Sequence, residues 1–182
     1  MQKVLVLLVL FVLTFSAIAD QPPQWNEFTI LSTDKTCFAH VAVKSKNGKP
    51  RAHQWSYQIR VYKKGRESDS LLWSCDYVYD GYAGGVLSDD GSTFVYARQW
   101  YEEDRPLVFV YQHGVLKKQL SRLDLGIDAS KLIKTASHRL WLENPKACRL
   151  IKKKGGAEKL QLRTVGKRSF EMDLRSFALE QK

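Results

Sequence analysis

An eight-residue segment occurs twice in the first half of the chain, and it constrains the fold more than any other feature. Residues 31–38 read LSTDKTCF, and residues 87–94 read LSDDGSTF. A second matching pair follows, since residues 59–65 (IRVYKKG) and 108–114 (VFVYQHG) share a Val-Tyr-x-x-Gly pattern. Apolar runs bounded by Asp, Ser and Gly are typical of strands and tight turns. The sequence therefore predicts two copies of one unit, each made of a turn, a strand, a loop, a second strand and a turn.

The spacing between the two copies changes along the unit. The first halves are offset by 56 residues and the second halves by 49. We therefore expect the first unit to carry a loop seven residues longer, within residues 44–53. A fainter third copy can be placed over residues 142–148, where Lys146 and Cys148 fall at the spacing of Lys35 and Cys37.

Six strand-length apolar runs lie before residue 112. They lie at residues 28–31, 37–43, 57–62, 71–79, 93–97 and 107–111. One short helix is predicted near residues 129–137, because Asp128 can cap its first turn. The predicted fold class is all-β, with two to three repeated antiparallel β units. These units form either a partial or small propeller-like array or a β-sandwich.

The first 19 residues form a separate segment. Lys3 precedes an apolar run at residues 4–15, and residues 17–19 (AIA) have the small-x-small pattern of a cleavage site. We expect a secretory signal peptide at 1–19 and a single all-β domain at 20–182. The apolar run is shorter than the roughly 20 residues of a membrane span, so no transmembrane anchor is expected. A bacterial periplasmic or secreted location is predicted.

The segment at residues 86–120, in which LSDDGSTFVY is followed by LVFVY, resembles the blade repeat of TolB-like β-propellers. Residues 28–73 resemble it more loosely. Propellers of this kind mostly serve as binding platforms, so the resemblance implies binding rather than catalysis. The chain departs from the family in size, because residues 20–182 make about three blades and closed propellers have about four to eight. The resemblance therefore implies an open array, a β-sandwich or an array completed by another copy.

Three cysteines, Cys37, Cys75 and Cys148, lie in the part expected to be exported. An oxidising compartment permits one disulfide among them and leaves one thiol free. We expect the bridge to join Cys37 and Cys75, because both fall in the first unit. No Cys-x-x-Cys or His-Glu-x-x-His pattern occurs, so we expect no metal site and no cofactor.

Positive charge is concentrated in the C-terminal third. Residues 131–182 hold 14 Lys and Arg against 5 Asp and Glu, whereas residues 20–128 hold 14 of each. A cationic surface concentrates anionic partners such as lipopolysaccharide head groups, acidic wall polymers or an acidic protein, and nucleic acid is not expected outside the cell. Lys152, Lys153 and Lys154 are predicted to contact such a partner from a hairpin tip, unless they only keep that tip soluble.

Trp100 and Tyr101, in the loop between the two strands of the second unit, are the other candidate binding residues. The sequence thus predicts an exported, non-catalytic β-repeat protein that binds a macromolecular or anionic envelope partner. The alternative is a hydrolase of envelope polymers, with Glu102, Glu103 or Asp104 and one histidine as acid and base. No known catalytic spacing relates these carboxylates to the four histidines, which are His40, His53, His113 and His138.

Overall fold

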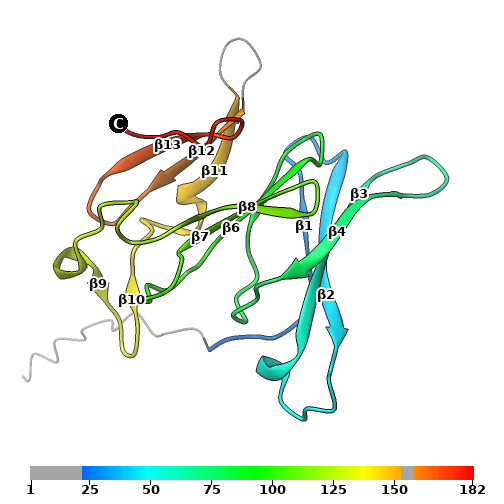
Figure 1. Ribbon diagram of the computed structural model, residues 1–182, viewed down its shortest axis with the longest axis horizontal. Helices are drawn as coiled ribbons and strands as arrows, with labels where there is room; N and C mark the ends of the chain where they lie inside the picture. Colours follow the sequence, from blue (N-terminus) through cyan, green and yellow to red (C-terminus); the bar gives the residue numbers. More distant parts are fainter. Residues whose placement is uncertain (1–21, 153–157) are drawn as a thin grey trace, which may run out of the picture.

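The computed structural model describes residues 22–152 and 158–182, and its main elements are three antiparallel sheets of four strands each (Figure 1). The first sheet holds β1 (Phe28–Leu31), β2 (Cys37–Ser45), β3 (Ser56–Lys63) and β4 (Ser70–Tyr77). The second holds β5 (Val86–Leu87), β6 (Thr93–Ala97), β7 (Val108–Gln112) and β8 (Val115–Leu120). The third holds β11 (Cys148–Lys152), β12 (Glu158–Arg163), β13 (Ser169–Asp173) and β14 (Leu179–Gln181). Each sheet is a meander in sequence order, which confirms the all-β class and the repeated antiparallel units.

The remaining elements are short. β9 (Ile133–Lys134) and β10 (Arg139–Leu140) pair as a hairpin between the second and third sheets. The single-turn 3-10 helices are η1 (Ala52–Gln54), η2 (Ala129–Lys131) and η3 (Pro145–Ala147). Asp128 caps η2 as expected, but the chain turns extended at Leu132, so the helix predicted near 129–137 is one 3-10 turn. Residues 22–152 and 158–182 contain no helix that could cross a membrane, and the expected signal peptide at 1–19 lies outside these residues.

The second sheet lies between the other two, and its strands β6 and β7 are buried on both faces (Figure 1). Side chains alternate between the faces of a strand, so its two faces differ in chemistry. The face toward the first sheet is aromatic, and the face toward the third sheet is aliphatic. The aromatic residues are Phe94, Tyr96, Phe109 and Tyr111, and the aliphatic ones are Val95, Val108 and Val110.

The repeated segment folds into a hydrogen-bonded turn at the start of the first unit. The Ser32 hydroxyl donates to the Asp34 carboxylate at 2.7 Å and accepts from the Cys37 amide at 3.0 Å. The Thr36 amide also donates to Asp34, at 3.0 Å. Short Asp and Ser side chains bond nearby backbone in this way, which explains why this sequence forms a turn before β2.

The second copy reproduces the same turn before β6. Ser88 donates to Asp90 at 2.7 Å and accepts from the Thr93 amide at 2.8 Å. The residue that follows the turn aspartate has a positive φ in both copies, 61° at Lys35 after Asp34 and 73° at Gly91 after Asp90. The predicted repeat is therefore a structural repeat.

The seven extra residues of the first unit lie in its strands. β2 has 9 residues and β6 has 5, while β3 has 8 and β7 has 5. The connections, residues 46–55 and 98–107, are equally long. The prediction of a longer loop at 44–53 was wrong, because residues added to both arms of a hairpin extend the paired ladder instead of the loop.

The third unit matches the others only in part. Cys148 begins β11 as Cys37 begins β2, and the Asn144 side chain accepts from the Lys146 amide in the preceding turn at 2.9 Å. The strand after the turn is second in the first two sheets but first in the third, whose fourth strand, β14, is added at the other edge.

Candidate functional site

A cavity of about 400 Å³ opens between the second and third sheets, next to β10. Four segments form its wall: the loop before β5, the end of β6 with the loop after it, β10, and the chain leading into β11. The lining residues are Tyr82, Ala83, Gly84, Gly85, Tyr96, Ala97, Gln99, Trp100, Leu140, Leu142, Glu143, Asn144 and Cys148. A concave, mostly apolar space of this size with a few polar groups is typical of small-molecule sites.

Aromatic rings form much of the cavity wall. The rings of Tyr82 and Trp100 meet nearly at right angles, at 78°, with centroids 5.9 Å apart. The backbone of Trp100 forms an isolated antiparallel β-bridge with Leu140 of β10. The amide of the next residue, Tyr101, donates to the Arg139 carbonyl at 2.8 Å, and these contacts hold Trp100 in place. Backbone pairing between the loop and β10 therefore fixes one side of the cavity.

A buried polar network lies behind the cavity wall. The Tyr96 hydroxyl donates to Asp80, and Arg98 lies 3.9 Å from Asp80 and 3.0 Å from Glu102. Arg98 is 5% exposed, and its charge is balanced by these two carboxylates. Burial raises the pKa of Asp80, against the hydrogen bond from Tyr96 and the charge of Arg98, which lower it. Removing the Asp80 carboxylate would leave the buried Arg98 with only the partly exposed Glu102 to balance its charge, so the network favours one arrangement of the wall.

The polar lining residues are Gln99, Glu143 and Asn144. The Glu143 carboxylate also pairs with Arg163 at 3.2 Å, and both side chains are about half exposed. Among the described residues, Glu143 is the one carboxylate that lines the cavity, and no histidine, lysine or arginine lines it.

The structure places the two predicted aromatic binding residues inside the molecule. Trp100 is 5% exposed and lines the cavity, whereas Tyr101 is 8% exposed and belongs to the core between the second and third sheets. Neither ring is presented to the surface. Trp100 reaches a ligand only through the cavity.

The acidic run proposed for a hydrolase does not face the cavity. Glu102 contacts Arg98 and Arg105, each at 3.0 Å, while Glu103 and Asp104 are exposed. Paired acid and base catalysis needs two groups that both reach the substrate. Over residues 22–152 and 158–182, the cavity lining offers Glu143 without a second carboxylate or a histidine.

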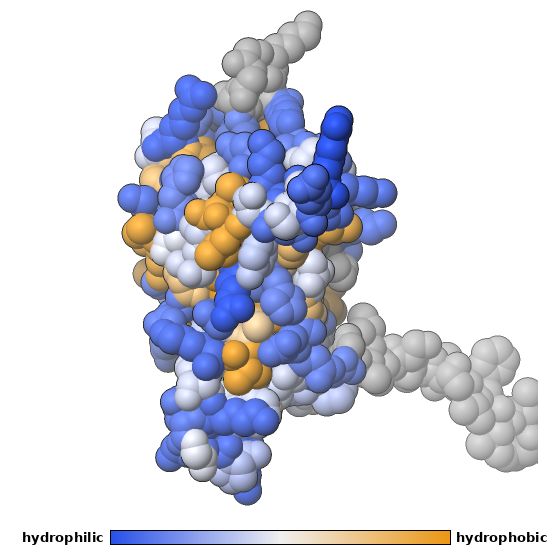
Figure 2. All heavy atoms as spheres, turned by 90° about the vertical axis from the view of Figure 1, so that its right-hand side faces the viewer, coloured by the Kyte–Doolittle hydropathy of each residue, from blue (hydrophilic) through white to orange (hydrophobic). Residues whose placement is uncertain are grey.

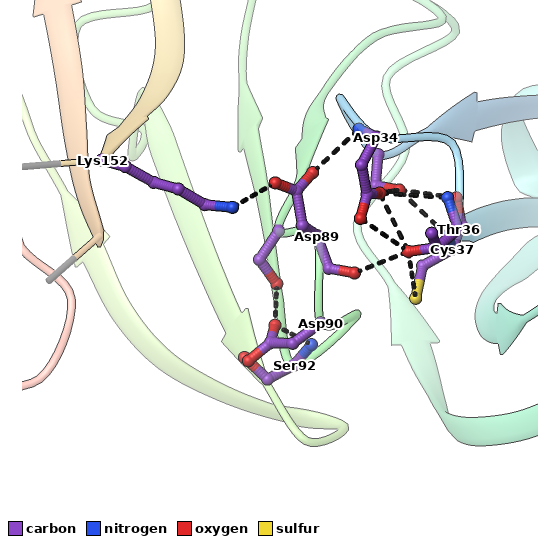
Figure 3. A network of polar contacts seen from close by, with 9 residues as sticks. Asp34, Thr36, Cys37, Asp89, Asp90, Ser92 and Lys152 are labelled. Atoms are coloured by element: carbon purple, nitrogen blue, oxygen red, sulfur yellow. Dashed lines mark hydrogen bonds and ion pairs between the residues drawn. The ribbon is translucent and has the colours of Figure 1, made fainter. Parts of the chain in front are cut away.

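Lys152 joins a network that connects all three sheets (Figure 3). Its ammonium lies 2.5 Å from the Asp89 carboxylate on the second sheet. The same carboxylate accepts from the Asp34 amide at 3.0 Å, and the Asp89 carbonyl accepts from the Thr36 hydroxyl at 3.1 Å. The hydrogen bond to Asp89 raises the pKa of Lys152. Lys152 remains 62% exposed but is paired, and Lys153 and Lys154 lie outside the described residues.

Other basic residues of the C-terminal third are also paired with acids. These pairs are Lys131–Asp128, Lys159–Glu171, Arg163–Glu143 and Lys182–Glu180. Exposed ion pairs contribute little to stability, but they do neutralise charge locally. These pairs neutralise part of the positive charge of residues 131–182, and a net positive excess remains.

The predicted disulfide between Cys37 and Cys75 is wrong, and all three cysteines are free thiols. Cys37 pairs with Lys63 and Cys75 with Ile59, on opposite sides of β3. A four-residue offset on β3 separates them by about 13 Å along the strand alone. The Cα atoms of a disulfide lie about 6 Å apart, so these two residues cannot be bridged.

The outer face of the first sheet carries an exposed apolar row. In register, Leu31 lies opposite Phe38, Phe38 opposite Tyr62, and Tyr62 opposite Leu71. Leu31 is 47% and Leu71 is 55% exposed, and the rings between them stack with centroids 5.0 Å apart. Figure 2 shows this side of the molecule, with apolar side chains in its upper half among hydrophilic ones. We call these four residues the outer row.

Comparison with known proteins adds no relative, since no family model matches the chain and no match is found among curated proteins. The resemblance to TolB-like blades therefore stays a prediction.

Proposed function

We propose that the protein is an exported, non-catalytic binding protein whose ligand site is the cavity between the second and third sheets. The cavity itself is the observation that carries this proposal: about 400 Å³, walled by Tyr82, Tyr96, Trp100, Leu140 and Leu142. An apolar, aromatic wall favours burial of a compact organic ligand, and the Asp80–Arg98 network behind it favours a site formed before the ligand arrives.

Filling the cavity tests this function. Gly84 lines the cavity, and a Cβ added to it would meet nothing within 4 Å, so Gly84→Phe should occupy the space without straining the backbone. Gly166→Phe, in the turn after β12, is the matched control, because a Cβ there meets Thr164 Oγ1 at 3.8 Å, an ordinary contact.

A panel of neutral, cationic and anionic fragments would be screened against the mature protein by saturation-transfer NMR. We expect fragments that bind wild type and Gly166→Phe but not Gly84→Phe. If no fragment distinguishes the two variants, the cavity is not a binding site.

The export part of the proposal is tested by intact-mass measurement, which should give a product that begins at Asp20.

The outer row supports a second candidate, contact with a macromolecular partner. Exposed apolar side chains aligned across four strands favour a protein surface, a second copy of the chain included. Photo-crosslinking from position 71 should trap adducts that are not trapped from position 123, where Leu123 is 77% exposed but isolated from the row. Equal adduct yields from the two positions would remove this candidate.

A further inference from the structure

We propose that the cavity selects an organic cation, an alkylated ammonium group on a small apolar body, over neutral and anionic ligands of the same shape. This inference rests on the proposed binding function and adds the chemical class of the ligand. It contrasts with the sequence, whose net charge of +10 favours anionic partners for the molecule as a whole.

The aromatic corner of the cavity is the first argument. Tyr82 and Trp100 both line the cavity as an edge-to-face pair with ring planes at 78°, and one face of Trp100 stacks on His138 with centroids 4.8 Å apart. Aromatic rings carry negative charge on their faces and attract cations within about 6 Å. Cages of two or three such rings bind alkylated ammonium groups, which cannot be satisfied by hydrogen bonds alone.

The charge of the lining is the second argument. Glu143 supplies the negative charge, and in the described part of the chain no lysine or arginine side chain lines the cavity to oppose a cation or attract an anion. Arg163, the partner of Glu143, belongs to β12 and lies outside the lining, and both side chains are 46% exposed. A bound cation would therefore compete with Arg163 for the carboxylate, in water-screened surroundings where that ion pair is weak.

The same residues argue against a metal ion as the cation. Calcium needs about six to eight oxygen ligands, and transition metals need several nitrogen, sulfur or oxygen donors. The lining offers one carboxylate together with apolar rings. In residues 22–152 and 158–182, no three His, Cys, Asp or Glu side chains are grouped to hold a metal.

Three probes that share a compact trimethyl head test the charge preference. Choline is compared with its uncharged isostere, in which a tert-butyl group replaces the trimethylammonium group, and with the anion pivalate. Binding to the mature protein is followed by NMR through the indole N–H of Trp100. We expect choline to bind at least about tenfold more tightly than the neutral isostere, and pivalate not to bind.

Two substitutions should move choline affinity in opposite directions. Glu143→Gln removes the carboxylate and should weaken choline several-fold while leaving the neutral isostere unchanged. Arg163→Gln removes the competing cation and should strengthen choline. Glu67→Gln, at an exposed carboxylate of the β3–β4 connection, is the matched control and should change neither ligand.

Each outcome bears on one of the two proposals. Equal affinity for choline and its neutral isostere, or tighter binding of pivalate, would overturn cation selectivity while leaving the cavity as a binding site. Binding of other fragments but not of choline would overturn it in the same way. Failure of every fragment to distinguish wild type from Gly84→Phe would overturn the binding function itself.

Discussion

Replacing Ser88 with alanine tests whether the repeated turn stabilises the fold through its hydrogen bonds. The side chain is 1% exposed, donates to Asp90 and accepts from the Thr93 amide. Without the hydroxyl, that amide is left buried with one acceptor fewer, which costs about 1 to 3 kcal/mol. The Asp90 carboxylate is exposed and can accept a hydrogen bond from water instead, so we expect the free energy of unfolding to fall by about 2 kcal/mol. A domain of this size loses about 2 to 4 °C per kcal/mol, so Tm should fall by about 4 to 8 °C.

Urea denaturation followed by circular dichroism gives the free energy of unfolding directly. Ser32→Ala, in the equivalent turn and 2% exposed, should cost the same within about 0.5 kcal/mol. Ser70→Ala, at an exposed serine that begins β4, should leave stability nearly unchanged. The reasoning fails if Ser88→Ala is no more destabilising than Ser70→Ala, since the turn bonds would then contribute nothing measurable.

Three further predictions follow from acidity, thiol chemistry and backbone conformation. Hydrogen bonding, first from the Thr36 amide, lowers the pKa of Asp34 to about 2, so its stabilising contribution is complete above its ordinary pKa and is lost as the pH falls toward 2. Acid titration should therefore show a shallower loss of stability for Asp34→Asn than for wild type. Burial raises the pKa of Cys75 to about 11 and that of Cys148 to about 12, so in native protein at neutral pH both should react slowly with iodoacetamide. Mass spectrometry should count three alkylated thiols after denaturation without reductant. Gly91→Ala should lower the unfolding free energy by about 1 to 2 kcal/mol, measured in urea, because its φ is 73° and a Cβ would lie 2.5 Å from a leucine side chain.

The strands that sequence predicts best are those whose pattern is local. β1 (Phe28–Leu31) and β6 (Thr93–Ala97) match their expected ranges, because a turn of Asp and Ser that bonds its own backbone follows the first and precedes the second. β8 was missed, since most of its side chains are exposed and its sequence, VLKKQL, has no buried face to set a period. β9 and β10, with two residues each, exist through their mutual pairing and not through any local pattern.

The cavity was not predictable from spacing. Its wall joins residues as far apart in sequence as Tyr82 and Cys148, and neither the glycines at 84–85 nor Glu143 belongs to a motif. Trp100 was the one signal, as one of two aromatic residues in a charged loop, although it lies inside the molecule and not on the surface. The disulfide prediction failed for a related reason. Cys37 and Cys75 belong to one unit, but the sequence does not show that β3 lies between their strands.

The two unlike faces of the second sheet mean that the three units are not interchangeable. The corresponding strands of the first unit alternate between buried residues such as Ile59 and polar ones such as His40 and Arg60. Inserted in the middle of the stack, such a unit would bury an arginine against the aliphatic core of the third sheet, at a cost of several kcal/mol. The duplicated turns therefore mark a shared local structure, while the order and number of sheets are set by which unit can be covered on both sides.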